Sequence, residues 1–256
     1  MCHDCPCGLP AAAAAKPESP APPQTSALLH LARNLLARND LQASANRRRF
    51  DAAGVRAVNL LSSPGSGKTA LLEALARHSP PGLRQAVIVA DLATDNDARR
   101  LQAAGLPAVQ ITTGQACHLE ASQVADGLAR LQAGGQPLEG LDRLWIENVG
   151  NLVCPAAYDL GEALRLVLLA AGEGEDKPLK YPALFHSADL VVISKIDLAD
   201  AVDFDRQRAH AAIAAVAPSA PVLEVSARTG QGLEALLQSL ATVPARVPDP
   251  VHHRHD

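Results

Sequence analysis

The turn at residues 62–69, SSPGSGKT, has the residue types and spacing of a phosphate-binding loop. It follows the pattern GxxxxGK[ST], except that Ser62 occupies the position of the first glycine. An apolar run precedes the turn and an amphipathic helical pattern follows it, which is the context that such a loop requires. Backbone N–H groups, a lysine ammonium and a threonine hydroxyl for Mg²⁺ would then face one triphosphate. The predicted contacts are Gly65, Ser66, Gly67, Lys68 and Thr69.

Acidic residues that end two later apolar runs are candidates for organising Mg²⁺ beside the phosphates. Asp91 and Glu147 each stand at such an end, and carboxylate oxygens are ligands that Mg²⁺ prefers. Either acid could instead cap the segment that follows it. Asp97 is a weaker third candidate, expected to be a solvated residue in the first turn of a helix. Gly150 is expected to present its N–H to the γ-phosphate, and the predicted catalytic group is Lys68, Thr69, Asp91 and Glu147.

Residues 194–197, Ser-Lys-Ile-Asp, follow another apolar run and resemble the guanine-reading NKxD signature of G proteins, with serine for asparagine. A carboxylate at Asp197 can accept hydrogen bonds from guanine N1–H and the 2-amino group, which adenine does not offer. The stem of Lys195 is expected to lie over the base. Ser226 and Ala227 follow the last apolar run, and a backbone N–H there is expected to contact guanine O6. The order of these motifs favours GTP over ATP.

Two cysteines and a histidine inside the same region could share one metal ion. Cys117 and His118 are adjacent and are expected at the start of a helix, while Cys154 follows the Glu147 turn. At a junction between loop and helix, neighbouring side chains can face one ion, and two thiolates with an imidazole suit Zn²⁺ or Ni²⁺. The alternative is a small buried cysteine beside an exposed histidine.

The first residues of the chain form a second sulfur motif, CxxCxC. Cys2, Cys5 and Cys7 could enclose a soft or borderline divalent metal, with the α-amine as a fourth donor if Met1 is removed. We expect metal ligands or reactive thiols rather than disulfides, because a reducing compartment keeps thiols reduced. The alternative is an oxidisable tail without function.

Apolar runs alternate with helical patterns from residue 55 onward, which predicts an α/β fold with a mostly parallel sheet and helices on both faces. The predicted strands are 55–62, 85–91, 107–111, 143–149, 164–171, 190–195 and 221–226. Periodicity alone leaves 164–171 open between strand and helix, and the GEGED segment that follows favours a strand. The predicted helices are 27–50, 69–78, 95–104, 118–132, 204–217 and 233–241.

Composition divides the chain into four parts. The cysteine motif occupies residues 1–8, and the Ala/Pro-rich stretch 9–26 is expected to be an extended linker. A nucleotide-binding domain with its leading amphipathic helix covers 27–243. The Pro-rich polar stretch 244–256 is expected to be a flexible tail.

Charge and hydropathy argue against two classes of partner. The net charge of −4 has the wrong sign for a protein that binds nucleic acid through phosphates, and six aromatic residues give few stacking surfaces. No stretch approaches the roughly 20 apolar residues that span a bilayer, and no signal peptide is visible. We therefore expect a cytoplasmic protein without nucleic-acid or membrane partners.

Taken together, these motifs resemble the HypB family of nickel-inserting GTPases in hydrogenase maturation. The resemblance covers nearly the whole chain, and Ser62 and Ser194 look like the family's own variants. It is carried by the N-terminal CxxCxC and by NLLSSPGSGKTALLEAL, DLATDNDARR, TTGQACHLEA, IENVGNLVCPAAYDLGE, KPLKYPALF and ISKIDL.

The resemblance implies a P-loop G domain of the SIMIBI type that binds GTP and GDP with Mg²⁺, hydrolyses GTP slowly and forms a homodimer favoured by GTP. It implies a role in loading Ni²⁺ into the large-subunit precursor of [NiFe] hydrogenase, with a HypA-type nickel/zinc metallochaperone as a further partner. Two metal sites are implied: a tight nickel site at Cys2, Cys5 and Cys7, and a weaker Zn²⁺ or Ni²⁺ site at a dimer interface, formed by Cys117, His118 and Cys154.

The N-terminal motif departs from the usual CxxCGC because Pro6 stands at the glycine position. Proline fixes φ and removes an N–H that could bond a thiolate, so the geometry of that site can differ. Two other functions remain open at this stage. One is nickel delivery to another enzyme, as by a urease-type accessory GTPase, and the other is metal buffering with a nucleotide-binding module.

Overall fold

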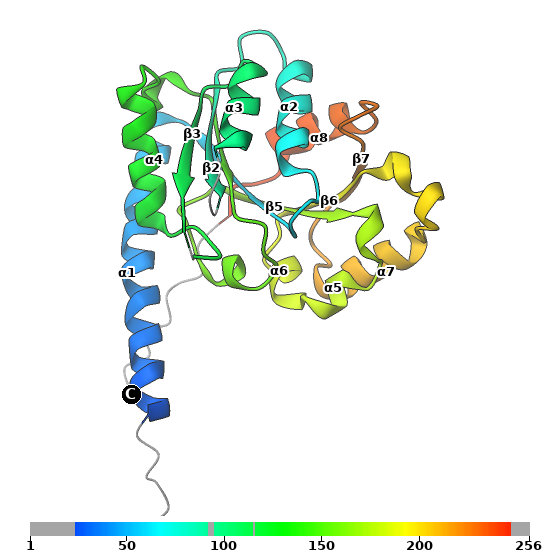
Figure 1. The fold of residues 1–256 in the computed structure, drawn as a ribbon, viewed down its shortest axis with the longest axis horizontal. Coiled ribbons are helices and arrows are strands. Elements are labelled where there is room, and N and C mark those ends of the chain that lie inside the picture. Colours follow the sequence, from blue (N-terminus) through cyan, green and yellow to red (C-terminus); the bar gives the residue numbers. More distant parts are fainter. Residues whose placement is uncertain (1–23, 92–94, 115, 247–256) are drawn as a thin grey trace, which may run out of the picture. The chain divides into compact units, whose positions relative to one another are not determined.

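The computed structural model describes residues 24–91, 95–114 and 116–246 (Figure 1). The chain divides into two units, Met1–Leu35 and Leu36–Asp256. Helix α1 (Gln24–Ala53) begins in the first unit and ends in the second. The Cys2, Cys5 and Cys7 motif, and with it the nickel site expected there, lies outside the described residues.

The second unit contains a seven-stranded sheet in which every neighbouring pair is parallel. The strand order is β3-β2-β4-β1-β5-β6-β7. Parallel pairing requires long crossovers, and the helices supply them. The strands are β1 (Arg56–Leu61), β2 (Gln85–Asp91), β3 (Ala108–Thr112), β4 (Arg143–Glu147), β5 (Leu164–Ala170), β6 (Leu190–Ser194) and β7 (Val222–Val225).

Helices cover both faces of this sheet (Figure 1). One face packs against α2 (Lys68–His78), α3 (Asn96–Ala103) and α8 (Leu233–Thr242). The other packs against α4 (Ala121–Ala133), α6 (Pro182–His186), α7 (Arg206–Val216) and the end of α1 around Phe50, while α5 (Lys177–Lys180) contacts α7. Central strands are therefore mostly apolar, because helices bury them from both sides.

The predicted strands all form, each end lying within two residues of its expected position. The segment 164–171 is a strand, as predicted, because β5 pairs with β1 and β6 and is buried over its whole length. Two short helices, α5 and α6, were not predicted, since Pro178 and Pro182 interrupt the helical pattern and stand in their first turns.

One predicted boundary was wrong in a way that bears on the metal ligands. Helix α4 begins at Ala121 rather than at 118. The backbone N–H of Glu120 donates to the side chain of Gln123, and this capping contact starts the helix after Glu120. Cys117 and His118 therefore lie in the loop before the helix and not in its first turn.

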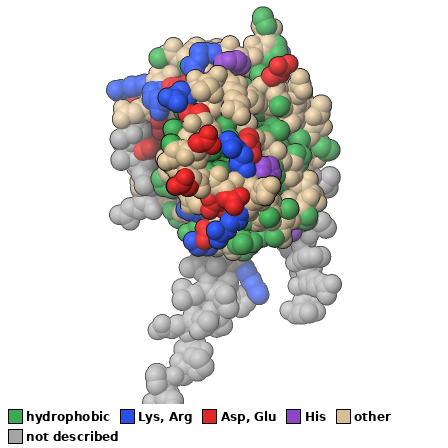
Figure 2. Space-filling view, turned by 90° about the vertical axis from the view of Figure 1, so that its right-hand side faces the viewer, with side chains coloured by type: hydrophobic (Ala, Val, Ile, Leu, Met, Phe, Trp, Pro, Cys, Tyr) green, Lys and Arg blue, Asp and Glu red, His purple; other side chains and the backbone are tan. Residues whose placement is uncertain are grey.

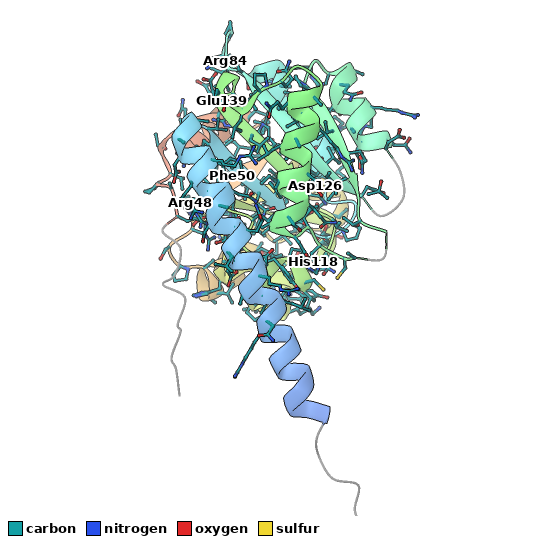
Figure 3. All side chains as sticks on the ribbon, turned by 90° about the vertical axis from the view of Figure 1, so that its left-hand side faces the viewer. Arg48, Phe50, Arg84, His118, Asp126 and Glu139 are labelled. Atoms are coloured by element: carbon teal, nitrogen blue, oxygen red, sulfur yellow. The ribbon has the colours of Figure 1, made fainter. Side chains whose placement is uncertain are left out.

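Because all strands are parallel, the loops after them meet at one end of the sheet. The phosphate-binding turn follows β1, Asp91 ends β2 and Glu147 ends β4. Figure 3 shows His118 at this end, while Arg84 and Glu139 mark the opposite end. Within the described ranges, no helix has the length and apolar character needed to cross a membrane.

At the other end of the chain, Arg246 is held inside the stretch predicted as a tail from 244. Its backbone N–H donates to Ala163 O at 2.9 Å, and its guanidinium donates to Ser187 O at 3.1 Å and approaches Asp189 at 3.4 Å. The chain is thus fixed to the amino end of β5 as far as Arg246.

Candidate nucleotide and metal sites

The turn between β1 and α2 has the backbone of a phosphate cradle. Gly65 and Gly67 have φ of 74° and 96°, a region in which residues with a side chain are strained. The Ser62 hydroxyl, at the position of the missing glycine, accepts hydrogen bonds from Ser66 Oγ at 2.5 Å and from Lys68 Nζ at 3.0 Å. Ser62 thus positions Lys68, a contact that a glycine could not make. Burial lowers the pKa of Lys68, and the charge of Glu147 opposes this shift.

Thr69 and Glu147 meet beside Lys68, although they come from different elements. Thr69 Oγ1 donates to Glu147 Oε1 at 2.7 Å, while Glu147 Oε2 is buried and has no hydrogen-bond partner among the described residues. Burial raises the pKa of Glu147 to about 7, against the opposing charge of Lys68. An orphaned carboxylate oxygen next to a threonine hydroxyl and a lysine fits a hydrated Mg²⁺.

These residues line a cavity of about 420 Å³ over the turn. Asp91 reaches it from β2 and Asp97 from the first turn of α3, so Asp97 faces the cavity more directly than its rank as third candidate suggested. The lining is Pro64, Gly65, Gly67, Lys68, Thr69, Ala70, Ala90, Asp91, Asp97, Arg100, Glu147, Asn148, Val149 and Gly150.

Arg100 is a cavity residue that the sequence analysis missed. Its guanidinium binds Glu73 through Nε at 3.0 Å and Nη2 at 2.9 Å, and Asp97 at 3.4 Å. The spacing of three residues between Asp97 and Arg100 puts both on one helix face and could have revealed the pair. Arg100 is an additional cation at the phosphate end, already engaged by carboxylates.

Gly150 lies directly on the phosphate-binding turn. A Cβ atom at this position would stand 2.7 Å from Pro64 Cα and 2.8 Å from Pro64 N. Only glycine permits this approach, which brings the loop after β4 against the turn. Gly150 therefore lies against the turn, and its role as a phosphate sensor stays a prediction.

A second cavity of about 300 Å³ adjoins the first, and both are lined by Gly67 and Ala70. Lys195 borders it with φ of 56°, and its Nζ donates to Gly65 O at 2.6 Å, so its stem crosses the turn. Asp197, Ala227 and Arg228 also line this cavity. Two adjoining cavities of this kind match the phosphate and base halves of a nucleotide.

Asp197 is held in place by two side chains. Ser226 Oγ donates to Asp197 Oδ1 at 2.6 Å, and Arg228 Nε donates to Oδ2 at 2.9 Å. The Ser226 hydroxyl, together with Arg228, lowers the pKa of Asp197. The backbone N–H of Ser226 donates to Gln231 O, so this group is already used, and the N–H of Ala227 is the one left for a base. Arg228 was not foreseen, since an exposed arginine after a strand has no distinctive spacing.

Cys117, His118 and Cys154 converge, as their sequence pattern suggested. Their ligand atoms all lie within 4.8 Å of one another, and the two sulfur atoms are 2.7 Å apart. His118 Nε2 is buried without a hydrogen-bond partner, and burial lowers the pKa of the ring. A neutral imidazole and two thiols form a donor set that fits Zn²⁺ or Ni²⁺.

Tyr158 packs against this cluster and was not predicted. Its ring lies 3.8 Å from that of His118, tilted by 33°. The hydrogen bond to Cys154 and then burial raise the pKa of Cys117. The Tyr158 ring, packed on one side of His118, fixes the plane of the imidazole. The contact could not be predicted, because no sequence motif connects positions 118 and 158.

The surface carries both signs of charge. On the face shown in Figure 2, acidic and basic side chains are interspersed rather than gathered into one basic patch. This mixture agrees with the small net charge of −4.

Comparisons with known proteins agree with this geometry. Residues 56–224 match the family model "CobW/HypB/UreG, nucleotide-binding domain". The chain is 50% identical over 212 residues to the hydrogenase maturation factor HypB of Azotobacter vinelandii, covering 81% of this chain and 67% of that protein. This chain belongs to the HypB family.

Other members of the HypB family extend the comparison. The hydrogenase/urease maturation factor HypB of Helicobacter pylori is 44% identical over 200 residues, covering 78% of this chain and 81% of that one. The crystal structure of H. pylori HypB in complex with nickel matches with a TM-score of 0.78 at 40% identity, over 83% of this chain and all of that one. The crystal structure of HypB from Archaeoglobus fulgidus matches with a TM-score of 0.73 at 36% identity. The match covers 80% of this chain and 98% of that one.

Proposed function

We propose that this protein is a GTP-hydrolysing nickel metallochaperone that helps to insert Ni²⁺ into the large subunit of [NiFe] hydrogenase. The observation that carries the proposal is the joint presence, in one unit, of a phosphate cavity at Lys68 and a thiol–imidazole cluster at Cys117. One loop leads from Glu147 to Cys154 and so belongs to both sites. HypB-family relatives are named for hydrogenase maturation, and one binds nickel.

In this proposal Lys68 contacts the β- and γ-phosphates, and Thr69, Asp91 and Glu147 hold Mg²⁺ and its waters. Bound Mg²⁺ would neutralise charge that develops on the transferred phosphoryl group. Lys68 stands at the first residue of α2, where the helix N-terminus favours anions. The raised pKa of Glu147 means that this carboxyl is charged only when a cation or a pH above about 7 favours it.

We propose slow hydrolysis. No glutamine lines the cavity within the described part of the chain, and Arg100, which does line it, is bound to Glu73 and Asp97. A side chain that orients water or one free arginine would be needed for fast turnover. Slow turnover suits a protein that uses its bound nucleotide as a conformational switch rather than one that produces GDP as a metabolite.

We propose guanine as the base and nickel or zinc as the bound metals. Asp197 is fixed and ionised beside the base cavity, which suits the two N–H donors of guanine. Ni²⁺ is the cargo, held by Cys2, Cys5 and Cys7 and exchanged at Cys117, His118 and Cys154, where Zn²⁺ can also bind. The reduced thiols this requires are consistent with the cytoplasm.

The proposed partners are a second copy of the chain, a HypA-type metallochaperone and the hydrogenase large-subunit precursor. Two exposed apolar side chains, Leu198 and Val202, closely follow Asp197 with exposures of 39% and 44%. Leu198 lines the base cavity. A nucleotide-dependent dimer formed over this segment would bury both side chains.

Hydrogenase activity in a bacterial strain that lacks its own maturation factor tests the proposal. The native protein should restore activity, and Lys68→Ala should not, because the phosphates lose their cation. Cys117→Ala should lower restoration, most strongly when nickel is scarce. Restoration by Lys68→Ala equal to the native protein would favour a metal-buffering role instead.

A second candidate, nickel delivery to urease, is favoured by the Helicobacter relatives that are named for both enzymes. The same strain carrying urease genes distinguishes the two. Recovery of hydrogenase without urease supports the main proposal, and recovery of urease alone contradicts it.

A further inference from the structure

Asn148 lies where the phosphate cavity and the metal cluster meet. It follows Glu147, lines the phosphate cavity and is 1% exposed. Its backbone N–H donates to Leu60 O at 3.2 Å, which fixes it to the strand that leads into the phosphate-binding turn. Two residues later, Gly150 lies against Pro64 of that turn. A displacement of this loop by a phosphate must therefore move or strain Asn148.

The side-chain oxygen of Asn148 joins this loop to the first arm of the metal cluster. Asn148 Oδ1 accepts from the backbone N–H of Leu119 at 3.1 Å and from that of Val149 at 2.9 Å. Leu119 directly follows His118 and is fully buried. One carbonyl oxygen thus binds a loop residue of the phosphate site and the residue next to a metal ligand.

The side-chain nitrogen of Asn148 leads to the second arm. Asn148 Nδ2 donates to Asn59 Oδ1 at 3.4 Å, and Asn59 Nδ2 donates to Glu162 Oε1 at 3.4 Å. Glu162 forms a buried ion pair with Arg165 at 2.6 Å. These contacts run across the carboxyl half of β1 toward the chain after Cys154.

Arg165 completes the second arm by holding the backbone around Cys154. Its Nη1 donates to Ala156 O at 3.0 Å, and its Nη2 donates to Tyr158 O at 2.8 Å. Cys154 begins the short helix that contains Ala156, and Tyr158 stacks on His118. Both arms of the metal cluster are therefore connected through hydrogen bonds to one asparagine.

This network is dry. Asn59 and Glu162 are 0% exposed, and Arg165 is 4% exposed. Water cannot replace a broken hydrogen bond there, and an unpaired buried polar group is costly. If one member of this network moves, the others must move with it, because each broken hydrogen bond would raise the free energy. The network is therefore suited to transmit a displacement.

We propose that Asn148 is the positioning residue that couples the nucleotide state to the Cys117–His118–Cys154 cluster, an inference that rests on the proposed function. A γ-phosphate that draws in the loop at Gly150 shifts Asn148, and its two side-chain bonds carry the shift to the Cys117 arm and to the Cys154 arm. The distance between the thiols, and hence metal affinity, then depends on the nucleotide. Linkage makes the effect reciprocal.

The test compares two nucleotide states in the full chain with two readouts. The first is the rate at which iodoacetamide alkylates Cys117 and Cys154 in metal-free protein, mapped by mass spectrometry. The second is Zn²⁺ affinity by competition with a chelator. Each is measured with Mg²⁺–GDP and with a nonhydrolysable GTP analogue, and the quantity of interest is the ratio between the two states.

Three variants separate coupling from general loosening. Asn148→Ala removes both side-chain arms. Asn59→Leu cuts only the arm to Glu162 and leaves the bond to Leu119 intact. Asn46→Ala is the matched control, because Asn46 is equally buried and donates to Ala121 O at 2.8 Å and Leu160 O at 3.1 Å but does not touch the loop at Asn148.

In the native protein we expect the two states to differ by about fivefold or more, the lower end of common allosteric couplings. Asn148→Ala should bring the ratio close to one at both thiols. Asn59→Leu should abolish the response of Cys154 and keep that of Cys117. Asn46→Ala should lower the unfolding midpoint and keep both ratios.

The inference is overturned if Asn148→Ala keeps the native ratio between the two nucleotide states. It is also overturned if Asn46→Ala loses this ratio as completely as Asn148→Ala does. Equal reactivity of the native thiols in both states also overturns it, although hydrogenase restoration by the native chain would then still support the proposed function. If Asn148→Ala does not fold, Asn59→Leu alone decides, since an unchanged Cys154 ratio contradicts the second arm.

Discussion

Thr69 and Glu147 share a hydrogen bond of 2.7 Å, and it joins the first turn of α2 to the end of β4. The bond occupies one oxygen of Glu147 and leaves the other buried without a partner among the described residues. A buried carboxyl so placed favours the neutral form until a cation arrives. The pair thus places a titratable carboxyl in the lining of the cavity over the phosphate-binding turn.

The raised pKa of Glu147 gives a prediction for stability against pH. The folded protein holds this proton up to a pKa of about 7, whereas the unfolded chain releases it near 4.5. The unfolded state binds fewer protons in this window, so Glu147 lowers stability progressively as pH rises from about 4.5 to about 7. Glu147→Gln has no such titration. Its free energy of unfolding relative to that of the native protein should therefore rise by about 2–3 kcal/mol as the pH goes from about 4.5 to about 7.

Urea unfolding of protein without nucleotide or magnesium, at pH 5 and pH 8, measures the effect. The unfolding free energy of Glu147→Gln, relative to that of the native protein, should be higher at pH 8 than at pH 5. An unchanged difference at the two pH values contradicts the raised pKa.

Much of this fold could be predicted from the sequence because its physical cause is local. Buried parallel strands are continuous apolar runs, and β2 is the clearest case, with the same bounds in the prediction and the structure. The start of α4 was missed because the capping contact of Glu120 with Gln123 outweighed an apolar pattern that begins earlier.

Base recognition by Asp197 gives a second prediction. Asn in its place would offer one donor and one acceptor, which suits the 2-oxo group and N1–H of xanthine and mismatches guanine. Asp197→Asn should weaken GDP binding by about 100-fold or more and improve XDP binding, since a polar site rejects a mismatched partner strongly.

Fluorescent-nucleotide competition with GDP, XDP and ADP provides the measurement. Arg206→Gln is a suitable control, because Arg206 binds Glu224 on the neighbouring strand and does not line the base cavity. GDP affinity that survives Asp197→Asn undiminished would remove Asp197 from the base site.

The approach of Gly150 to Pro64 gives a third prediction. Gly150→Ala places a Cβ 2.7 Å from Pro64 Cα, so the loop or the phosphate-binding turn must shift. GDP and GTP-analogue affinity should fall by about tenfold or more, because a phosphate cradle depends on exact backbone positions. Gly172→Ala is the control, since no atom lies within 4 Å of a Cβ there.

Calorimetric titration of both variants with Mg²⁺–GDP measures the difference. Equal affinity of Gly150→Ala and Gly172→Ala would mean that the loop after β4 does not need to lie against the turn.

The buried pair of Glu162 and Arg165 gives a fourth prediction. Burial alone raises the pKa of Glu162, but the charge and hydrogen bond of Arg165 outweigh it and lower the pKa to about 2. Glu162→Gln removes the carboxylate that is paired directly with the buried Arg165 and should cost about 3–5 kcal/mol. The lowered pKa also means that the ion pair stabilises the native state above pH 4.5 and loses this contribution as pH falls toward 2.

Chemical denaturation at pH 7 measures the cost, and Asp142→Asn is the control. Asp142 pairs with Arg84 at 2.8 Å on the exposed end of the sheet, where an ion pair contributes little. Equal destabilisation by Glu162→Gln and Asp142→Asn would contradict the importance of the buried pair.

Site residues were predictable where one short motif carries them and were missed where distant segments meet. Lys68 and Thr69 follow from a motif of eight residues. Arg228 and Tyr158 gain their places only through folding, Arg228 by its bond to Asp197 and Tyr158 by its contact with His118. Asn148 belongs to the second group, because its partners outside its own loop lie on β1 and in the segment before α4.

Calorimetry of the purified full chain with magnesium and nucleotides tests the central claim, namely that this turn binds a guanine nucleotide. GDP and a nonhydrolysable GTP analogue should each bind with one site per chain, ADP should bind far more weakly, and Lys68→Ala should abolish the heat of GTP-analogue binding. Absence of binding by both guanine nucleotides to the folded native protein, or equal affinity for ADP, would contradict it.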